Sequence, residues 1–193
     1  NMWTGLRMSE LISLSWDDID MENWTASICR AKVDGHFKKT KTKGSTRTID
    51  LLSPAIKSLM VLKEYSFDLS PISRTVISED NKTKFNEEWR PIFINTNTHK
   101  PHAHSNTVCN RFWQNHLKIA GVRYRSSGQT RHTYASQLLT TGGIPKEWIA
   151  MQMGHTTTKM VDKHYTKWMS DDAPNMSKIA NNALGFNSID ELN

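Results

Sequence analysis

The second half of this sequence is divided into helical segments by glycine and proline, and this punctuation limits the folds open to the chain. Apolar residues recur there at helical spacing, and the first three segments end at glycines, which are natural helix stops. Ser105 can cap the first segment and Pro145 can open the third. We expect four helices, which run from Ser105 to Gly121, from Thr130 to Leu139, from Pro145 to Gly154 and from Thr158 to Trp168.

The first half mixes short helices with short strands. Residues 24–30 and 46–51 are β-branched and alternate in polarity, which predicts a small antiparallel sheet. Apolar spacing predicts a helix over 6–14 and another over 53–65, with Ser53 as its cap and Pro54 in its first turn. The stretch from Phe67 to Asn97 is polar and poorly periodic, so we expect loops there, with one short strand at 91–94.

A cluster of cations lies between the two predicted strands. Residues 38–47 contain five basic side chains and no acidic one, which predicts a basic hairpin. Composition alone favours the plainer interpretation of a solvated charged hairpin. The whole chain of 193 residues has a formal charge of +6, which suits an anionic partner. The cations are Lys38, Lys39, Lys41, Lys43 and Arg47.

Composition and length limit the number of domains and the cellular compartment that we expect. A chain of this length suits one compact domain, and it has no apolar run long enough to cross a bilayer. Its two cysteines, Cys29 and Cys109, form neither a disulfide framework nor a metal knuckle, so we expect a reducing, cytoplasmic setting. Because the first residue is not methionine and the first motif follows at once, we expect the chain to be a fragment with an upstream part removed.

Two arginines stand in unusual local settings. Arg7 opens a helix in an otherwise apolar segment, and Arg131 lies on a helix whose inward face carries Tyr134 and Ala135. Guanidinium forks match the non-bridging oxygens of a phosphodiester better than ammonium groups do. Arg7 has a plain alternative, a structural ion pair with Glu10 three residues along the helix. Each arginine alone is therefore weak evidence for phosphate chemistry.

A tyrosine among cations provides a candidate nucleophile. Tyr165 lies in a basic terminal segment, ten residues after His155. A tyrosine hydroxyl ordinarily titrates near pH 10, so neighbouring positive charge or a base must help it to ionise. The alternative is a half-buried tyrosine with its hydroxyl at the surface.

Four motifs together resemble the catalytic half of a tyrosine recombinase of the phage integrase family. They are Thr4-Gly5-Leu6-Arg7-Met8-Ser9-Glu10-Leu11, Thr130-Arg131-His132-Thr133, Met153-Gly154-His155 and His164-Tyr165. The resemblance implies an α+β fold, a mostly helical integrase-like catalytic domain with a small antiparallel sheet that carries a basic hairpin. It implies a catalytic domain over 1–169 without its upstream core-binding domain, followed by a tail over 170–193 that could pack on a neighbouring protomer.

The resemblance also implies roles for individual residues. Arg7 and Arg131 would be the catalytic arginines, with His155 beside them and Tyr165 as the nucleophile. Lys41 would be the proton donor on the hairpin, with Lys43 a serious competitor and Lys39 a lesser one, because hairpin register is not fixed by sequence. The residues expected to bind DNA are Lys39, Lys43, Arg47, Arg123 and Arg125.

The reaction implied is cleavage and rejoining of DNA strands through a 3′-phosphotyrosine, for integration or excision of a mobile element. It needs no cofactor and no metal. The partners implied are double-stranded DNA and further copies of the chain, a tetramer on DNA and a monomer in isolation, with no membrane. The protein would be bacterial or phage-encoded and cytoplasmic.

One position departs from the family pattern. The pattern usually reads His-x-x-Arg at the second arginine, whereas this chain has glycine at Gly128. If that histidine normally helps to accept the tyrosine proton, this chain must do without it or use another group.

Two other functions stay open. The first is a DNA-binding module without catalysis, in which the basic surfaces hold phosphates and Tyr165 only packs. The second is a metal-dependent nuclease built on three closely spaced imidazoles, although no carboxylate flanks them. These imidazoles belong to His99, His102 and His104.

Overall fold

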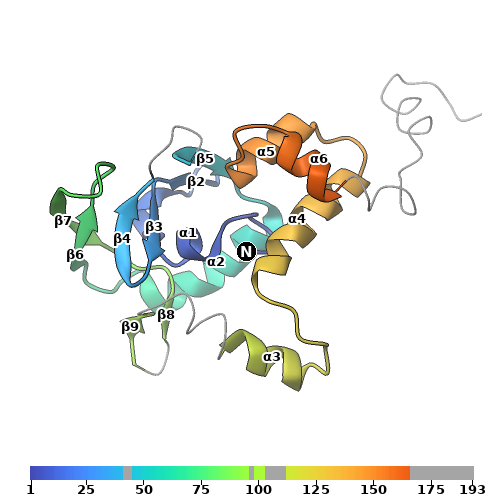
Figure 1. Cartoon of the computed structure of the whole chain (residues 1–193). Coiled ribbons are helices and arrows are strands. Elements are labelled where there is room, and N and C mark those ends of the chain that lie inside the picture. Colours follow the sequence, from blue (N-terminus) through green and yellow to red (C-terminus); the bar gives the residue numbers. More distant parts are fainter. Residues whose placement is uncertain (41–44, 96–97, 103–111, 166–193) are drawn as a thin grey trace, which may run out of the picture.

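The computed structural model of the chain describes residues 1–40, 45–95, 98–102 and 112–165, and side chains as far as residue 162. Figure 1 shows strands gathered on one side and helices α4 to α6 on the other, with the N-terminal segment between them. The mixed α+β architecture predicted from the sequence is confirmed.

A three-stranded antiparallel sheet forms where the alternating segments predict it. Strands β1 (Ile19–Asp20), β2 (Thr25–Ile28) and β5 (Arg47–Asp50) lie in the order β1-β2-β5. Ala26 stands opposite Ile49, and both are buried. This pairing sets the inward face of β5, which also carries Arg47 two residues earlier.

A second sheet contains strands that the sequence analysis missed. Strands β3 (Arg30–Val33), β4 (His36–Lys39), β6 (Ile72–Ile77) and β7 (Lys84–Trp89) lie in the order β3-β4-β6-β7. The prediction of loops after Phe67 was wrong. The inward positions of this hairpin include Arg74 and Glu87, which pair at 2.6 Å, so charged residues hide the apolar alternation.

The helices of the first half are close to their predicted places. Helix α1 (Met8–Leu11) is shorter than predicted and leads to the 3₁₀ turn η1 (Trp16–Asp18). Helix α2 (Ser53–Ser66) forms as expected, but its N-cap is Leu52 and no side chain caps it, so the predicted serine cap is wrong. Strands β8 (Ile94–Asn95) and β9 (Lys100–Pro101) make a small two-stranded sheet.

The helical half follows its glycine punctuation. Its helices are α3 (Gln114–Ile119), α4 (Gly128–Thr140), α5 (Lys146–Met153) and α6 (Lys159–Tyr165). Gly154 ends α5 with φ +70°, a left-handed conformation that favours glycine. The predicted cap Ser105, the end of the fourth helix at Trp168 and the tail over 170–193 lie outside the described residues.

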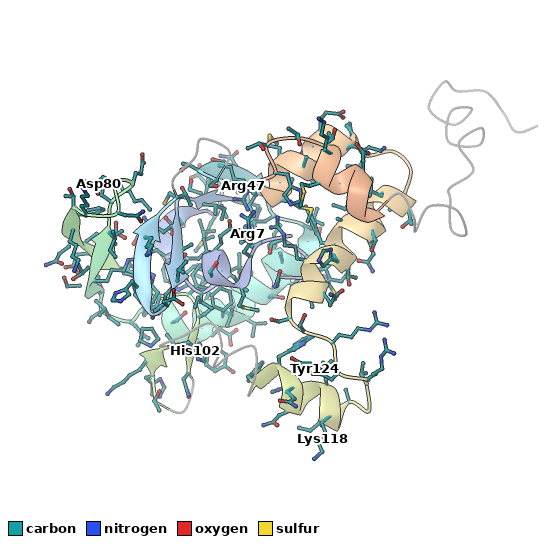
Figure 2. All side chains as sticks on the ribbon, viewed as in Figure 1. Arg7, Arg47, Asp80, His102, Lys118 and Tyr124 are labelled. Carbon is teal, nitrogen blue, oxygen red and sulfur yellow. The ribbon has the colours of Figure 1, made fainter. Side chains whose placement is uncertain are left out.

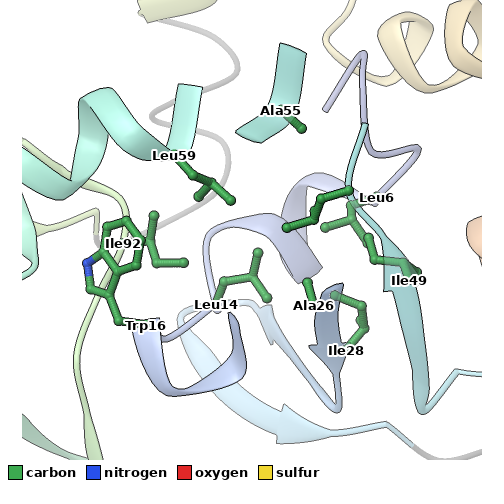
Figure 3. Close-up of a cluster of buried hydrophobic side chains, with 10 residues drawn as sticks. Leu6, Leu14, Trp16, Ala26, Ile28, Ile49, Ala55, Leu59 and Ile92 are labelled. Atoms are coloured by element: carbon green, nitrogen blue, oxygen red, sulfur yellow. The ribbon is translucent and has the colours of Figure 1, made fainter. Parts of the chain in front are cut away.

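Two main clusters of buried side chains hold the fold. Figure 3 shows the first, in which Leu6, Leu14 and Trp16 meet side chains from β2, β5 and α2. The second joins α4, α5 and α6 through buried residues such as Tyr134 and Met153. Burial of such apolar side chains contributes about 25 cal/mol per Å². Among the described residues, no helix is long and apolar enough to span a membrane.

A buried arginine fastens the second sheet to the first helix. The Arg74 guanidinium lies 4.5 Å from the ring centre of Phe37 and 4.6 Å from that of Trp89. It also donates to the Ser13 carbonyl, 3.1 Å away and just beyond α1. The β6–β7 hairpin therefore supports the segment that carries Arg7.

Candidate active site

Arg7 is held at the surface by a buried carboxylate. It stands at the N-cap of α1, and its Nη1 donates to Oε1 of Glu10 at 2.8 Å. The Arg7 side chain is 47% exposed, whereas that of Glu10 is 3% exposed. The other Glu10 oxygen accepts from the Arg7 backbone N–H at 2.9 Å. The ion pair weighed in the sequence analysis therefore exists, and it leaves half of the guanidinium side chain facing solvent.

Arg131 joins three distant parts of the chain. Its Nη1 donates to the carbonyl of Gly5, two residues before Arg7, and its Nη2 donates to the Met153 carbonyl at 2.6 Å. The same Nη2 lies 3.0 Å from Nε2 of His155. Arginine has donors only, so the imidazole Nε2 is the acceptor. The structure thus brings Arg131 and His155 into contact and places Arg131 beside the backbone segment that leads to Arg7.

A glycine permits the close approach at Gly5. It has φ +62°, and a Cβ built there would lie 2.6 Å from the ring of Tyr134. The Tyr134 ring therefore packs directly on the backbone whose carbonyl receives Arg131. A larger residue would have to push either the ring or the backbone away.

Arg47 lies in the interior, although the sequence predicts a DNA contact for it. Its side chain is 5% exposed, and Nη2 pairs with Oε2 of Glu10 at 3.0 Å. Its Nε donates to the carbonyl of Gln152 at 3.0 Å. Figure 2 labels Arg7 and Arg47 close together, between the strands and helices α4 and α5. This placement favours a structural role for Arg47 in place of contact with DNA.

Charge and burial compete at Glu10. Burial alone would raise the pKa of this carboxyl, but the hydrogen bonds and positive charges of Arg47 and Arg7 outweigh it, so the pKa lies below its ordinary value. Glu10 therefore stays ionised and anchors two guanidinium groups at once.

Gln152 is a site residue that the sequence analysis missed. It is fully buried, its Oε1 accepts from the Asp50 backbone at 3.1 Å, and its Nε2 donates to the Asp50 carboxylate at 3.0 Å. These bonds fasten the end of α5 to β5. Its place on α5 between Ile149 and Met153, both buried, was the sequence feature that could have indicated an inward position.

An open groove of about 670 Å³ adjoins His155. One wall is the start of β5, and the other is α5. Threonines line both sides of it, Thr46 and Thr48 on one and Thr156 to Thr158 on the other. Its lining residues are Thr46, Arg47, Thr48, Glu147, Ala150, Met151, His155, Thr156, Thr157 and Thr158.

The remaining predicted residues are placed only in part. Tyr165 is the last residue of α6, which packs against α4 and α5, but its side chain lies outside the described part. Lys41 and Lys43 also lie outside it. Lys39 is described and exposed, at the end of β4 with its Nζ 5.1 Å from the ring centre of Phe85.

Two predicted DNA contacts lie on the segment between α3 and α4. Arg123 and Arg125 are both exposed, and the carbonyl of Arg125 accepts from Trp113 Nε1 at 2.7 Å. The segment stands away from the strands in Figure 2, where Tyr124 is labelled. Its cations therefore face solvent.

Gly128 begins α4, one turn before Arg131. A Cβ built there would meet only the Ser126 hydroxyl oxygen, at 3.8 Å. Its backbone is not in the left-handed region. Packing therefore does not demand a glycine at the position where the family pattern has histidine.

The imidazole cluster considered for a metal is described only in part. His99 and His102 are placed, whereas His104 is not. Across 1–40, 45–95, 98–102 and 112–165, no three histidine, cysteine, aspartate or glutamate side chains gather as metal ligands would. Burial, and then the charge of Lys32, lower the pKa of His102.

Comparison with known proteins places this arrangement in a family. The model of the phage integrase family matches residues 2–170. IntQ of Escherichia coli (strain K12), whose name marks it as defective, is 35% identical over 178 residues, covering 89% of this chain and 44% of IntQ. Prophage integrase IntR of the same strain is 33% identical over 186 residues, covering 89% of this chain and 43% of IntR.

A solved structure shares the fold. The integrase of transposon Tn1549, solved in complex with circular intermediate DNA, matches with a TM-score of 0.65 at 18% identity, over 85% of this chain and 52% of that one. The chain spans less than half the length of the two curated relatives. With its family's model matched over most of its length, the chain belongs to the phage integrase family.

Proposed function

We propose that this chain is the catalytic domain of a tyrosine-type site-specific DNA recombinase, which integrates or excises a mobile element. The observation that carries the proposal is the contact of Arg131 with both His155 and the Gly5 carbonyl. This contact supports a single site made from residues near positions 7, 131 and 155. Two guanidinium groups and an imidazole in one region suit the charge of a phosphate under attack.

The proposed reaction begins with an in-line attack. The Tyr165 hydroxyl loses its proton to water as its oxygen bonds to a DNA phosphorus and the bond to the 5′ oxygen breaks, leaving a 3′-phosphotyrosine and a 5′ hydroxyl. Lys41 gives its proton to the leaving oxygen, while Arg7, Arg131 and His155 stabilise the charge on the non-bridging oxygens. A 5′ hydroxyl from another duplex then reverses the step and joins the exchanged strands. The covalent link keeps the energy of the broken bond, so the reaction needs neither a nucleotide cofactor nor a metal.

The proposed partner is double-stranded DNA. The Tn1549 integrase was solved with DNA, and this chain carries a net charge of +6 with exposed cations at Lys39, Arg123 and Arg125. Recombination needs paired sites, so we also propose a homotetramer on DNA that forms from monomers in the bacterial cytoplasm. Residues 1–169 would form the catalytic domain, and 170–193 a tail that packs on a neighbouring copy.

A trapped covalent adduct tests this function. The probe is a pool of nicked duplexes with randomised base pairs around the candidate phosphate, so that many target sequences are offered at once. Loss of the short nicked fragment prevents religation, so a cleaving protein becomes bound to DNA through a bond that resists denaturant. We expect such an adduct to form in excess chelator. DNA binding without an adduct would support the non-catalytic module, and an adduct-free cleavage that chelator abolishes would support a metal nuclease.

A further inference from the structure

We propose that Arg47 is a positioning residue of this site. It neutralises Glu10, so that the positive charge of Arg7 is available to the phosphate, and it supports the turn that carries His155. The inference rests on the proposed function, because it assigns a role relative to Arg7 and His155 as phosphate-binding groups. It replaces the DNA-contacting role predicted for Arg47 from the sequence.

Each nitrogen of the Arg47 guanidinium donates a hydrogen bond inside the protein. Its Nη2 and Nη1 lie 3.0 and 3.3 Å from the two Glu10 carboxylate oxygens. Its Nη1 also donates to the Ser45 carbonyl at 3.2 Å, and its Nε donates to the Gln152 carbonyl at 3.0 Å. With 5% of its side chain exposed, it has little surface to offer an incoming phosphate, although it borders the groove beside His155.

The charges explain why Glu10 needs this second arginine. Arg7 and Glu10 alone would be neutral, so a phosphate would compete with the carboxylate for the Arg7 guanidinium. With Arg47 included, the three groups carry a net charge of +1, and Arg7 is the exposed member. A buried carboxylate that loses one of two cations turns more strongly to the remaining one. Loss of Arg47 should therefore bind Arg7 more tightly to Glu10.

The geometry also connects Arg47 to His155. The Gln152 carbonyl is among the last of α5, where helix carbonyls lack intrahelical partners, and the Arg47 Nε satisfies it. Gly154 lies on the guanidinium so closely that a Cβ there would be 2.6 Å from Nη1. The next residue is His155. Arg47 therefore links the Glu10 side of the site to the turn from which the imidazole extends.

The test compares four variants on one duplex taken from the adduct pool: Arg47→Met, Arg47→Lys, Glu10→Gln and the double variant Glu10→Gln/Arg47→Met. Lys57→Met, on the exposed face of α2, controls for the loss of one positive charge. Single-turnover cleavage, DNA affinity at several salt concentrations and thermal midpoints are measured for each. Wild type and Lys57→Met must both form adduct, and failure of both overturns the proposed function itself.

We expect Arg47→Met to slow cleavage by about 100-fold while DNA affinity changes less than about 3-fold, as for a group that acts on the transition state. Arg47→Lys should restore part of the rate. The double variant should cleave at least about tenfold faster than Arg47→Met, because no unpaired carboxylate then competes for Arg7.

Three results would overturn the inference while the wild type still cleaves. One is wild-type cleavage by Arg47→Met. Another is a salt dependence of DNA affinity that is weaker in that variant by the amount expected for about one lost phosphate contact, which would show that Arg47 touches DNA. The third is a double variant that cleaves no faster than Arg47→Met although the two variants have the same thermal midpoint. This result would show that Arg47 has a purely structural role.

Discussion

Arg131 donates one hydrogen bond to the carbonyl of Gly5 and places its other terminal nitrogen 3.0 Å from Nε2 of His155. The first contact spans 126 positions of sequence. A single side chain thus fixes the N-terminal segment, which leads to Arg7, against the turn after α5. Arg131 thereby bonds to the backbone two residues before Arg7, although the two arginines lie far apart in the sequence.

Replacing Arg131 with lysine should break this unit while keeping the charge. One ammonium group cannot reach the Gly5 and Met153 carbonyls in the fork geometry of a guanidinium. We expect Arg131→Lys to slow adduct formation by at least about 100-fold. Arg90→Lys, at a position where the guanidinium pairs with Asp17 at 3.1 Å, should cleave within about 3-fold of wild type. Equal rates for the two variants would contradict the role of the Arg131 fork.

Gly5 should tolerate no side chain. Alanine there would take an unfavourable left-handed conformation and place its Cβ 2.6 Å from the Tyr134 ring. We expect Gly5→Ala to lower the free energy of unfolding by at least about 2 kcal/mol, measured by urea denaturation. Gly121→Ala is the matched control, since Gly121 has a similar φ of +66° but a Cβ there meets nothing within 4 Å among the described residues. A loss of similar size in both variants would show that the close approach at Gly5 is not the cause.

The Tyr134 hydroxyl should be dispensable for folding. Its residue is 1% exposed, and the oxygen has no hydrogen-bond partner among the described residues. Burial, and then the charge of Asp50, raise its pKa to about 12. An unsatisfied buried polar group costs about 1–3 kcal/mol of stability. We therefore expect Tyr134→Phe to raise the free energy of unfolding by about 1 kcal/mol.

The same change should alter the alkaline stability. The folded state keeps the Tyr134 proton more tightly than the unfolded state, so stability is lost as pH rises above the ordinary value of 10.0 toward about 12. Tyr134→Phe should remove that part of the loss. A variant less stable than wild type at neutral pH would show instead that the hydroxyl has a stabilising partner.

Glu10 should make the chain sensitive to acid. Its pKa in the folded state lies below the ordinary value of 4.5, so its contribution is present above pH 4.5 and is lost as the pH falls through the lowered pKa. Denaturant titrations between about pH 3 and 6 should show this loss in the wild type. Glu10→Gln should flatten the profile over that range. If stability depends on pH in the same way in Glu10→Gln and in the wild type, other carboxyl groups cause the loss of stability in acid.

Much of the fold follows from local signals in the sequence. Glycine marks the end of α5 at Gly154, and the alternating apolar residues of β2 and β5 predict their pairing. These elements were predictable because local conformation and burial agree there. The β6–β7 hairpin was not predicted, because Arg74 and Glu87 occupy inward positions, which their ion pair and the contacts of Arg74 with Ser13, Phe37 and Trp89 make favourable.

The site was predictable in the same uneven way. Arg131 and His155 meet, as expected from motifs far apart in the sequence. Arg47 was assigned to the surface because it follows a run of lysines. Its alternation with Ile49 and Leu51, both buried, was the signal for an inward position. A charged residue in a basic segment is expected to face solvent. Its counter-ion, Glu10, lies far away in the sequence, so the sequence alone did not indicate that Arg47 is buried.

The account depends most directly on Tyr165 as the nucleophile. The decisive measurement is peptide mapping of the covalent adduct trapped on the nicked duplex, with Tyr165→Phe processed in parallel. We predict that the DNA is attached through the phenolic oxygen of Tyr165 and that the phenylalanine variant binds the duplex but forms no adduct. Attachment to another residue, or an adduct that persists in Tyr165→Phe, would contradict the account.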